Sequence, residues 1–135
     1  MSRIEVQRRK GTLLIVRRLS DVELEIIENG EDDWVLFAHV MGIVANSSRT
    51  TLSEPEVLEI ASSVCLDLCE SGFANLGRYT DKEAFVAWPE SGAELRQRLR
   101  NEIDHPPRGI DRELNLMRIM VDILPEGLRA WKQEP

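Results

Sequence analysis

Residues 53–88, SEPEVLEIASSVCLDLCESGFANLGRYTDKEAFVAW, carry the clearest structural signals of the chain. The first half of this stretch predicts one long helix. Ser53 and Glu56 have the spacing of a capping box, in which each side chain accepts the backbone N–H of the other residue. Pro55, in the first turn, removes an N–H that has no helical partner in any case. Gly72 is typical of a left-handed helix end.

The apolar residues of this predicted helix lie on one side of it. At the helical repeat they form a stripe wide enough to pack against a core. The stripe and its border consist of Val57, Leu58, Ala61, Val64, Cys65, Leu68 and Cys69. We therefore expect the rest of the chain to be organised around this helix.

After Gly72 the sequence changes from helical to strand character. Residues 73–79 and 84–88 are short and rich in aromatic and branched residues, and the polar residues 80–83 between them suit a hairpin turn. Pro89 ends the second strand because it cannot donate to a ladder. A second capping-box pattern, Ser91 to Glu94, then predicts a further helix over 93–103.

More helices are expected on both sides of this core. Ser20 to Glu23 is another capping-box pattern and predicts a short helix that stops near Gly30. Acidic residues suit a helix N-terminus, so we expect the next helix over 33–46. Asp111 is expected to cap a last helix that runs to Leu124 and is apolar nearly all round. Such a helix is either central to the core or shared with a second copy. The residues expected at that self-association surface are Leu116, Met117, Met120 and Ile123.

The expected fold is therefore a mostly helical α+β domain. Its core consists of a helix, a second helix and a β-hairpin, with flanking helices. We expect a single globular domain over 11–135, preceded by a basic, flexible N-terminus over 1–10. Residues 12–16 could be a strand or the first turns of a helix, because periodicity cannot decide over so short a run.

Composition and cysteine usage narrow the class of protein. With 42% apolar and 30% charged residues the chain resembles an ordinary soluble domain. No apolar run approaches the roughly 20 residues that span a bilayer. Two cysteines and no recognisable export signal predict a reducing cytoplasm.

The net charge of −7 is unevenly distributed along the chain. Residues 1–18 hold six basic residues and one acid, whereas residues 19–71 hold twelve acids and one base. Two explanations fit this asymmetry. Either the basic arm and the acidic body attract each other, within the fold or across a dimer, or the arm binds a polyanion. We favour the first, because six charges are too few to require a nucleic-acid partner.

Side chains that could carry chemistry are few. Cys65 and Cys69 are spaced to face one metal ion, but a site needs two more ligands and the only histidines are His39 and His105. We expect buried thiols instead of a metal site, and a satisfied interior histidine at position 39. The glycines form no phosphate-binding loop. No catalytic residue, cofactor or metal is expected, and the protein is predicted not to be an enzyme.

The order helix, polar connection, helix, two-stranded wing resembles a winged-helix domain over residues 33–88. The stretch is also similar to small uncharacterised bacterial proteins with a tryptophan-containing first helix and a wing that ends in an aromatic-x-x-Trp pattern, here Phe85-Val86-Ala87-Trp88. The winged-helix resemblance implies that the helix before the wing enters the DNA major groove. The charge of that helix argues against this role, because residues 54–71 contain five acids and no base.

We therefore expect a non-enzymatic protein–protein interaction domain that binds a basic partner. Steering by an acidic surface suits such a partner, and the residues expected to make the contact are Glu54, Glu56 and Glu59. An immunity-type protein that neutralises a basic partner is one concrete form of this function. The alternative is a winged-helix transcriptional regulator that binds nucleic acid through basic regions outside the acidic helix.

Overall fold

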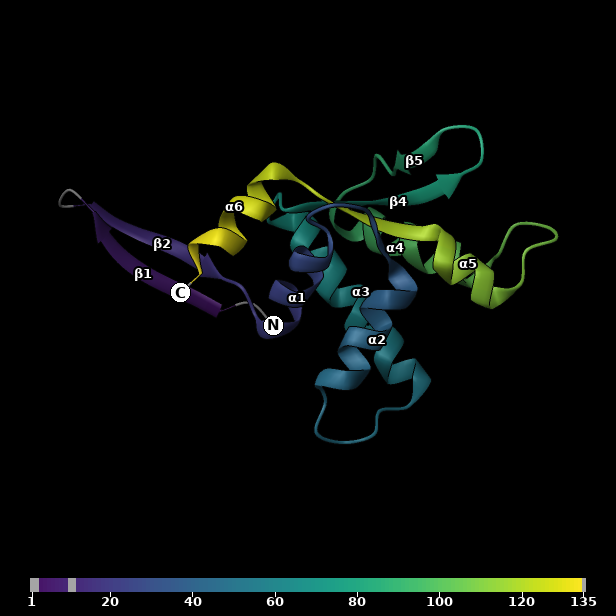
Figure 1. Ribbon diagram of the computed structural model, residues 1–135, viewed down its shortest axis with the longest axis horizontal. Helices are drawn as coiled ribbons and strands as arrows, with labels where there is room; N and C mark the ends of the chain where they lie inside the picture. The colour runs from purple at the N-terminus through teal and green to yellow at the C-terminus, as the bar shows by residue number, and fades with distance from the viewer. Residues whose placement is uncertain (1–2, 10–11, 135) are drawn as a thin grey trace.

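A four-stranded antiparallel sheet lies along one side of the domain, and helices pack against one of its faces (Figure 1). The computed structural model describes residues 3–9 and 12–134. The described elements are β1 (Arg3–Arg9), β2 (Thr12–Arg18), α1 (Asp21–Asn29), β3 (Val35–Leu36), α2 (Phe37–Ser47), α3 (Glu54–Glu70), β4 (Ala74–Thr80), β5 (Ala84–Ala87), α4 (Gly92–Asp104), α5 (Arg112–Arg118), β6 (Ile119–Ile123) and α6 (Pro125–Gln133). The fold is therefore of the α+β class, as expected. Each described helix is too short or too polar to cross a lipid bilayer.

The long helix and the hairpin of residues 53–88 are confirmed. In α3 the Ser53 hydroxyl accepts the N–H of Glu56, and the Glu56 carboxylate accepts the N–H of Ser53 at 2.9 Å. Gly72 follows the helix at φ +76°. Strands β4 and β5 pair from Gly77–Ala87 to Thr80–Ala84. Local signals were sufficient here because caps and turns are made by neighbours in the sequence.

The capping boxes give a matched pair for testing helix stability. Ser53→Ala removes a cap and is expected to cost about 1 kcal/mol in the free energy of unfolding. Ser91 makes no side-chain cap hydrogen bond, so the capping box expected there is wrong. Gly92, the first residue of α4, has a φ of +57°, so the chain turns directly after Ser91. Ser91→Ala should therefore be nearly neutral in urea denaturation, and equal losses for the two variants would contradict this account.

The last long helix expected from the sequence is wrong over its second half. Helix α5 ends at Arg118, and Ile119–Ile123 forms β6 between β3 and β4. Ile119, Val121 and Ile123 are buried towards the helices, and the residues between them are only half-buried. Ile119, Val121 and Ile123 alternate as in a strand buried on one face, but within the apolar run from Leu116 to Leu124 so short a segment cannot be told from a buried helix by periodicity alone.

This strand also divides the expected self-association surface. Leu116 and Ile123 are buried in the core, at 6% and 7% exposure, and cannot contact a second copy. Met120 is half-buried on the other face of the sheet, and Met117 is exposed on α5. The four residues therefore do not form one surface.

The helix expected over 33–46 begins later, at Phe37. Val35 and Leu36 form β3 instead and pair with Val121 and Met120 of β6. The reason is tertiary: the partner strand lies far away in the sequence and satisfies the backbone groups of this short segment. The acidic residues before it lie in the loop that follows α1, not in a helical first turn.

The N-terminal residues expected to be flexible form a strand over Arg3–Arg9. This strand, β1, pairs with β2 along its whole length, from Arg3–Arg18 to Arg9–Thr12. The alternation of charged or polar residues with Ile4 and Val6 suits this pairing. Residues 12–16 are thereby part of a strand, and residues 1, 2 and 10 of the expected flexible segment lie outside the described residues.

Candidate functional site

The two cysteines lack the ionisation that chemistry would need. Cys65 is fully buried and burial raises the pKa of its thiol. Burial raises the pKa of Cys69 to about 11, against a weaker opposite effect from the backbone of Leu76. Both thiols therefore stay protonated near neutral pH, which does not suit a nucleophile. Among the described residues no group of three or more His, Cys, Asp or Glu side chains could hold a metal ion.

The histidines are placed differently from the sequence expectation. His39 was expected in the interior, but it lies on the exposed side of α2. This expectation was wrong because the buried stripe of α2 runs through Phe37, Val40, Ile43 and Val44 instead. His105 ends α4 and its Nδ1 lies 3.1 Å from the carbonyl oxygen of Asn101.

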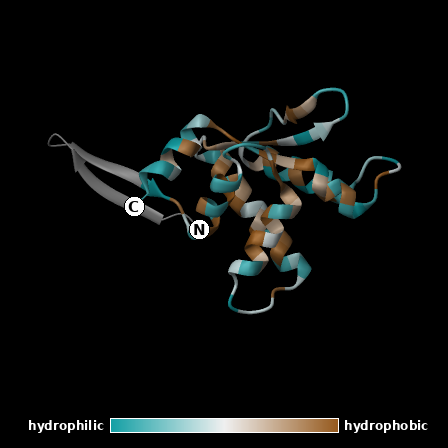
Figure 2. Cartoon of the chain, in the orientation of Figure 1, coloured by the Kyte–Doolittle hydropathy of each residue, from teal (hydrophilic) through white to brown (hydrophobic). Residues whose placement is uncertain are grey.

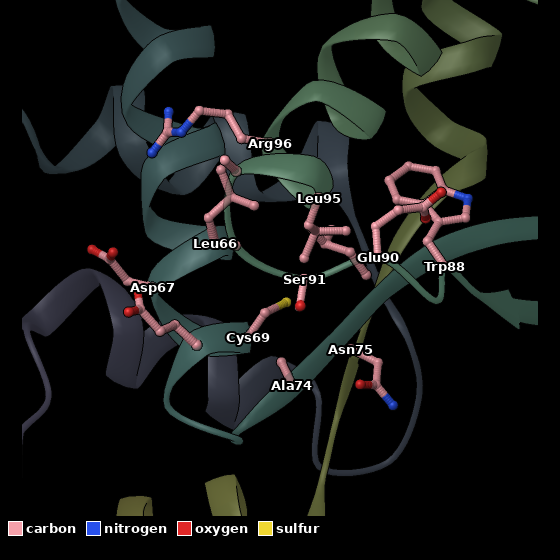
Figure 3. A pocket seen from close by; sticks show the side chains of 14 residues that line it. Leu66, Asp67, Cys69, Ala74, Asn75, Trp88, Glu90, Ser91, Leu95 and Arg96 are labelled. Carbon is pink, nitrogen blue, oxygen red and sulfur yellow. The ribbon is translucent and has the colours of Figure 1, made fainter.

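A cavity of about 510 Å³ lies between the end of α3, the start of β4 and the start of α4 (Figure 3). Cys69 and Ser91 point into it (Figure 3). Its charged lining includes three acids, Asp67, Glu70 and Glu90, and one base, Arg96. The cavity thus contains the protonated thiol of Cys69, and three of the four charged side chains that line it are acidic. It contains no activated nucleophile.

A second candidate surface is the face of the sheet that the helices leave uncovered. In β6, Met120 and Asp122 point away from the core, and the register places Gly77 and Asn75 of β4 beside them. Helices α2, α3 and α4 lie on the opposite side of the sheet (Figure 1). We call this surface the open face. It consists of Trp34, Leu36, Asn75, Gly77, Tyr79, Phe85, Ala87, Met120 and Asp122.

An aromatic pair lies across the open face. The rings of Trp34 and Phe85 stack with their centroids 5.9 Å apart and an interplanar angle of 24°. The two residues belong to opposite edges of the sheet, roughly 14 Å apart at the usual strand spacing, so both side chains reach inward. Gly77 makes this possible, since a Cβ there would lie 2.8 Å from Cζ of Phe85. Trp34 nevertheless remains 37% exposed, and β5 is coloured apolar at the edge of the sheet (Figure 2).

Carboxylates gather at the β3 side of the open face. Glu31, Asp32 and Asp33 precede Trp34, and together with Asp122 they line an open cavity of about 320 Å³. We call these four residues the acidic end. Partial burial raises the pKa of Asp122, and Asp33 accepts the backbone N–H of Trp34 at 2.8 Å. The side chains of Glu31 and Asp32 are exposed, and no ion pair is present for either among the described residues.

The acids expected to bind a partner lie elsewhere, on the first half of α3. Glu54 forms an ion pair with Arg112, and Glu59 lies 3.9 Å from Arg100. Glu56 closes the helix cap, and its hydrogen bonds with Ser53 lower the pKa of its carboxyl group. All three are exposed, but each already has a contact within the chain.

The sequence reasoning missed the open face. The sequence predicts Trp34 in a helix, and no alternation of polar and apolar residues marks an outward-facing side of β5, because Phe85, Val86 and Ala87 are all apolar. Asp122 was hidden in the apolar run that was expected to be helical.

No protein-family model matches the chain, and neither a curated protein nor a solved structure matches it.

Proposed function

We propose that this protein is a non-enzymatic binding module whose open face binds a basic protein partner. The observation that carries the proposal is the stacked pair of Trp34 and Phe85 on a sheet face without a helix over it, beside the acidic end. Exposed aromatic patches rimmed by polar groups are typical of protein-interaction sites.

Each part of this surface has a role in binding. Trp and Tyr side chains in the middle of an interface often dominate its affinity, and Trp34 offers a ring that is already held in place by Phe85. The acidic end attracts a basic partner and speeds encounter. A lysine or arginine that reaches these carboxylates also lies close to the indole of Trp34, where a cation–π contact adds to the ion pair. An immunity-type protein that neutralises a basic partner is one concrete form of this function.

The proposal is tested first by cross-linking at the open face. A photoreactive phenylalanine analogue in place of Trp34 is expected to capture a basic protein in the native host, and the adduct should persist after nuclease treatment. The same analogue in place of Lys132, which is exposed on α6, serves as the control and should not capture that protein. Equal capture at the two positions would contradict the proposal.

The captured protein is then purified and its affinity measured by calorimetry. Trp34→Ala is expected to weaken binding by about 30-fold, as for a central aromatic contact. Glu59→Gln on α3 should change the affinity by less than about twofold, because an exposed charge outside the interface contributes little to the binding free energy. If Glu59→Gln weakened binding more than Trp34→Ala, the binding site would lie on α3 instead of the open face. Glu56 is unsuitable for this comparison, since its carboxylate also caps the helix.

A winged-helix regulator is the alternative function. The order α1, α2, α3 and then the β4–β5 hairpin supports it. Two observations oppose it: α3 carries no base, and β6 lies between β3 and β4. Binding would then depend on the basic residues of the N-terminal hairpin or of α4. Recovery of nucleic acid alone in the cross-linking experiment would favour this alternative.

A further inference from the structure

Strand β5 forms one edge of the four-stranded sheet. Directly after it, the backbone N–H of Trp88 donates to the carbonyl oxygen of Leu76 at 2.9 Å, so the backbone groups of Trp88 face β4. In an antiparallel pair these groups point to alternate sides from one residue to the next. Those of Val86 therefore also face β4. The N–H and C=O groups of Phe85 and Ala87 point the other way, out of the sheet.

These outward backbone groups of β5 are left without partners. Among the described residues, no hydrogen bond reaches them. The strand lies at the margin of the molecule and packs mainly on β4 (Figure 1). Its sequence, AFVA, contains no charge and no proline, and its register with β4 contains no bulge. Because these are the features that usually protect a sheet edge, β5 can act as a template for a further strand.

The two residues with outward backbone groups also belong to the open face. The side chains of Phe85 and Ala87 lie on that face, and the ring of Phe85 stacks on Trp34. A partner on the open face therefore reaches the edge of β5 within the same contact. An added strand lies about 4.8 Å from its neighbour, so every second side chain of it would stand beside Phe85 or Ala87.

The charge along this edge selects the kind of segment that can be added. Residues 81–90 contain three acids, Asp81, Glu83 and Glu90, and one base, Lys82, which gives a net charge of −2. Glu83 has no ion pair among the described residues. The same edge of a second copy would bring the same negative charge against it, which disfavours pairing between two β5 strands. A basic segment meets the opposite charge instead.

We infer that the basic partner adds an extended segment to the sheet as a fifth strand along β5. Its backbone bonds to the outward N–H and C=O groups of Phe85 and Ala87. Its apolar side chains lie against these two residues on the open face, and its basic side chains lie near the acids at both ends of β5. Main-chain hydrogen bonds then supply affinity, and the alternate side chains supply specificity. This inference rests on the proposed function, since the segment belongs to the partner that binds the open face.

Amide hydrogen exchange followed by NMR tests strand addition. The probe is a capped synthetic peptide, Lys-Arg-Val-Thr-Val-Arg-Lys, added to the labelled protein up to about 1 mM. The amides of Phe85 and Ala87 should exchange at least about tenfold more slowly with the peptide, because each becomes hydrogen-bonded. The amide of Val86 is the internal reference and should exchange slowly even without the peptide. An analogue with glutamate at the basic positions should give no protection.

A pair of variants at position 87 tests the backbone contact. Ala87→Pro removes an outward N–H and keeps the hydrogen bonds between β4 and β5, since an edge strand tolerates proline where the N–H faces solvent. It should weaken binding of the peptide at least about fivefold, the equivalent of one hydrogen bond. Ala87→Val keeps the N–H and is the matched control, which should bind at least as tightly as the native chain. Slow exchange of the Val86 amide shows that the hairpin of the proline variant is intact.

Two results would overturn the inference. They are amides of Phe85 and Ala87 that stay unprotected at the highest peptide concentration, and equal affinities of the proline and valine variants for the peptide. The proposed function is judged separately, by the capture at position 34 and by Trp34→Ala. If the captured protein binds both variants at position 87 equally tightly, the proposed function stands and strand addition is lost. If position 34 captures no protein while the peptide protects both amides, the proposed function is lost and the edge remains a strand-binding site.

Discussion

Replacing Asn115 with leucine is expected to lower the free energy of unfolding by about 3 kcal/mol, because two polar partners lose their hydrogen bonds inside the protein. Asn115 is completely buried. Its Oδ1 accepts from Nη2 of Arg78 at 2.7 Å, and its Nδ2 donates to the carbonyl oxygen of Glu102 at 2.8 Å. The side chain therefore joins α5 to both β4 and α4.

The network around Asn115 explains why this loss is not easily compensated. Arg78 also pairs with Glu102 at 3.1 Å, and Glu102 accepts from Nε of Arg98 at 3.0 Å. Arg98 in turn pairs with Glu90 and lies over the ring of Trp88, at 5.2 Å from its centroid. Leucine has a similar volume but no polar atom, so the guanidinium of Arg78 keeps its charge with one partner fewer.

Urea denaturation followed by tryptophan fluorescence measures this effect. Asn101→Ala on the exposed side of α4 is the matched control, since the hydrogen bond that the side chain of Asn101 makes among the described residues is the one its Oδ1 accepts from Nε2 of Gln97 on the same helix. It should change stability by less than about 0.5 kcal/mol. An Asn115→Leu variant that is as stable as the native chain would show that the network contributes no net stability.

Gly77→Ala is expected to destabilise the sheet by about 3 kcal/mol through overpacking. A Cβ at this position would overlap the carbonyl oxygen of Val86 and would lie 2.8 Å from Cζ of Phe85. The first neighbour is backbone, so relief requires β4 and β5 to separate. The second neighbour belongs to the aromatic pair, so the variant should also displace Phe85 from Trp34.

The glycine of α2 provides a control with the opposite sign. A Cβ at Gly42 would meet nothing within 4 Å, and alanine favours a helix over glycine. Gly42→Ala should therefore stabilise the domain by about 0.5–1 kcal/mol. Thermal unfolding followed by circular dichroism, with the near-ultraviolet signal for the aromatic pair, compares the two variants. A neutral Gly77→Ala with an unchanged aromatic signal would refute the close approach of β5 to β4.

The elements that the sequence predicted correctly are those with local signals. The capping boxes at Ser20 and Ser53 position the starts of α1 and α3, and the polar turn between 80 and 84 positions the hairpin. These signals act between residues at most four positions apart, so a single sequence carries them in full. The surplus of acids was also evident from the sequence alone.

Contacts between distant segments determine which apolar segment is a strand and where the aromatic residues meet. Ile119–Ile123 is a strand because β3 and β4 satisfy its backbone from both sides, and β3 exists only through this pairing. Trp34 and Phe85 lie at opposite edges of the sheet, with β6 and β4 between them. Their rings stack across these strands because Gly77 leaves room for the ring of Phe85. Caps, turns and charge follow from the local sequence, whereas the open face arises from pairings between distant segments, whose energy depends on contacts that no local pattern encodes.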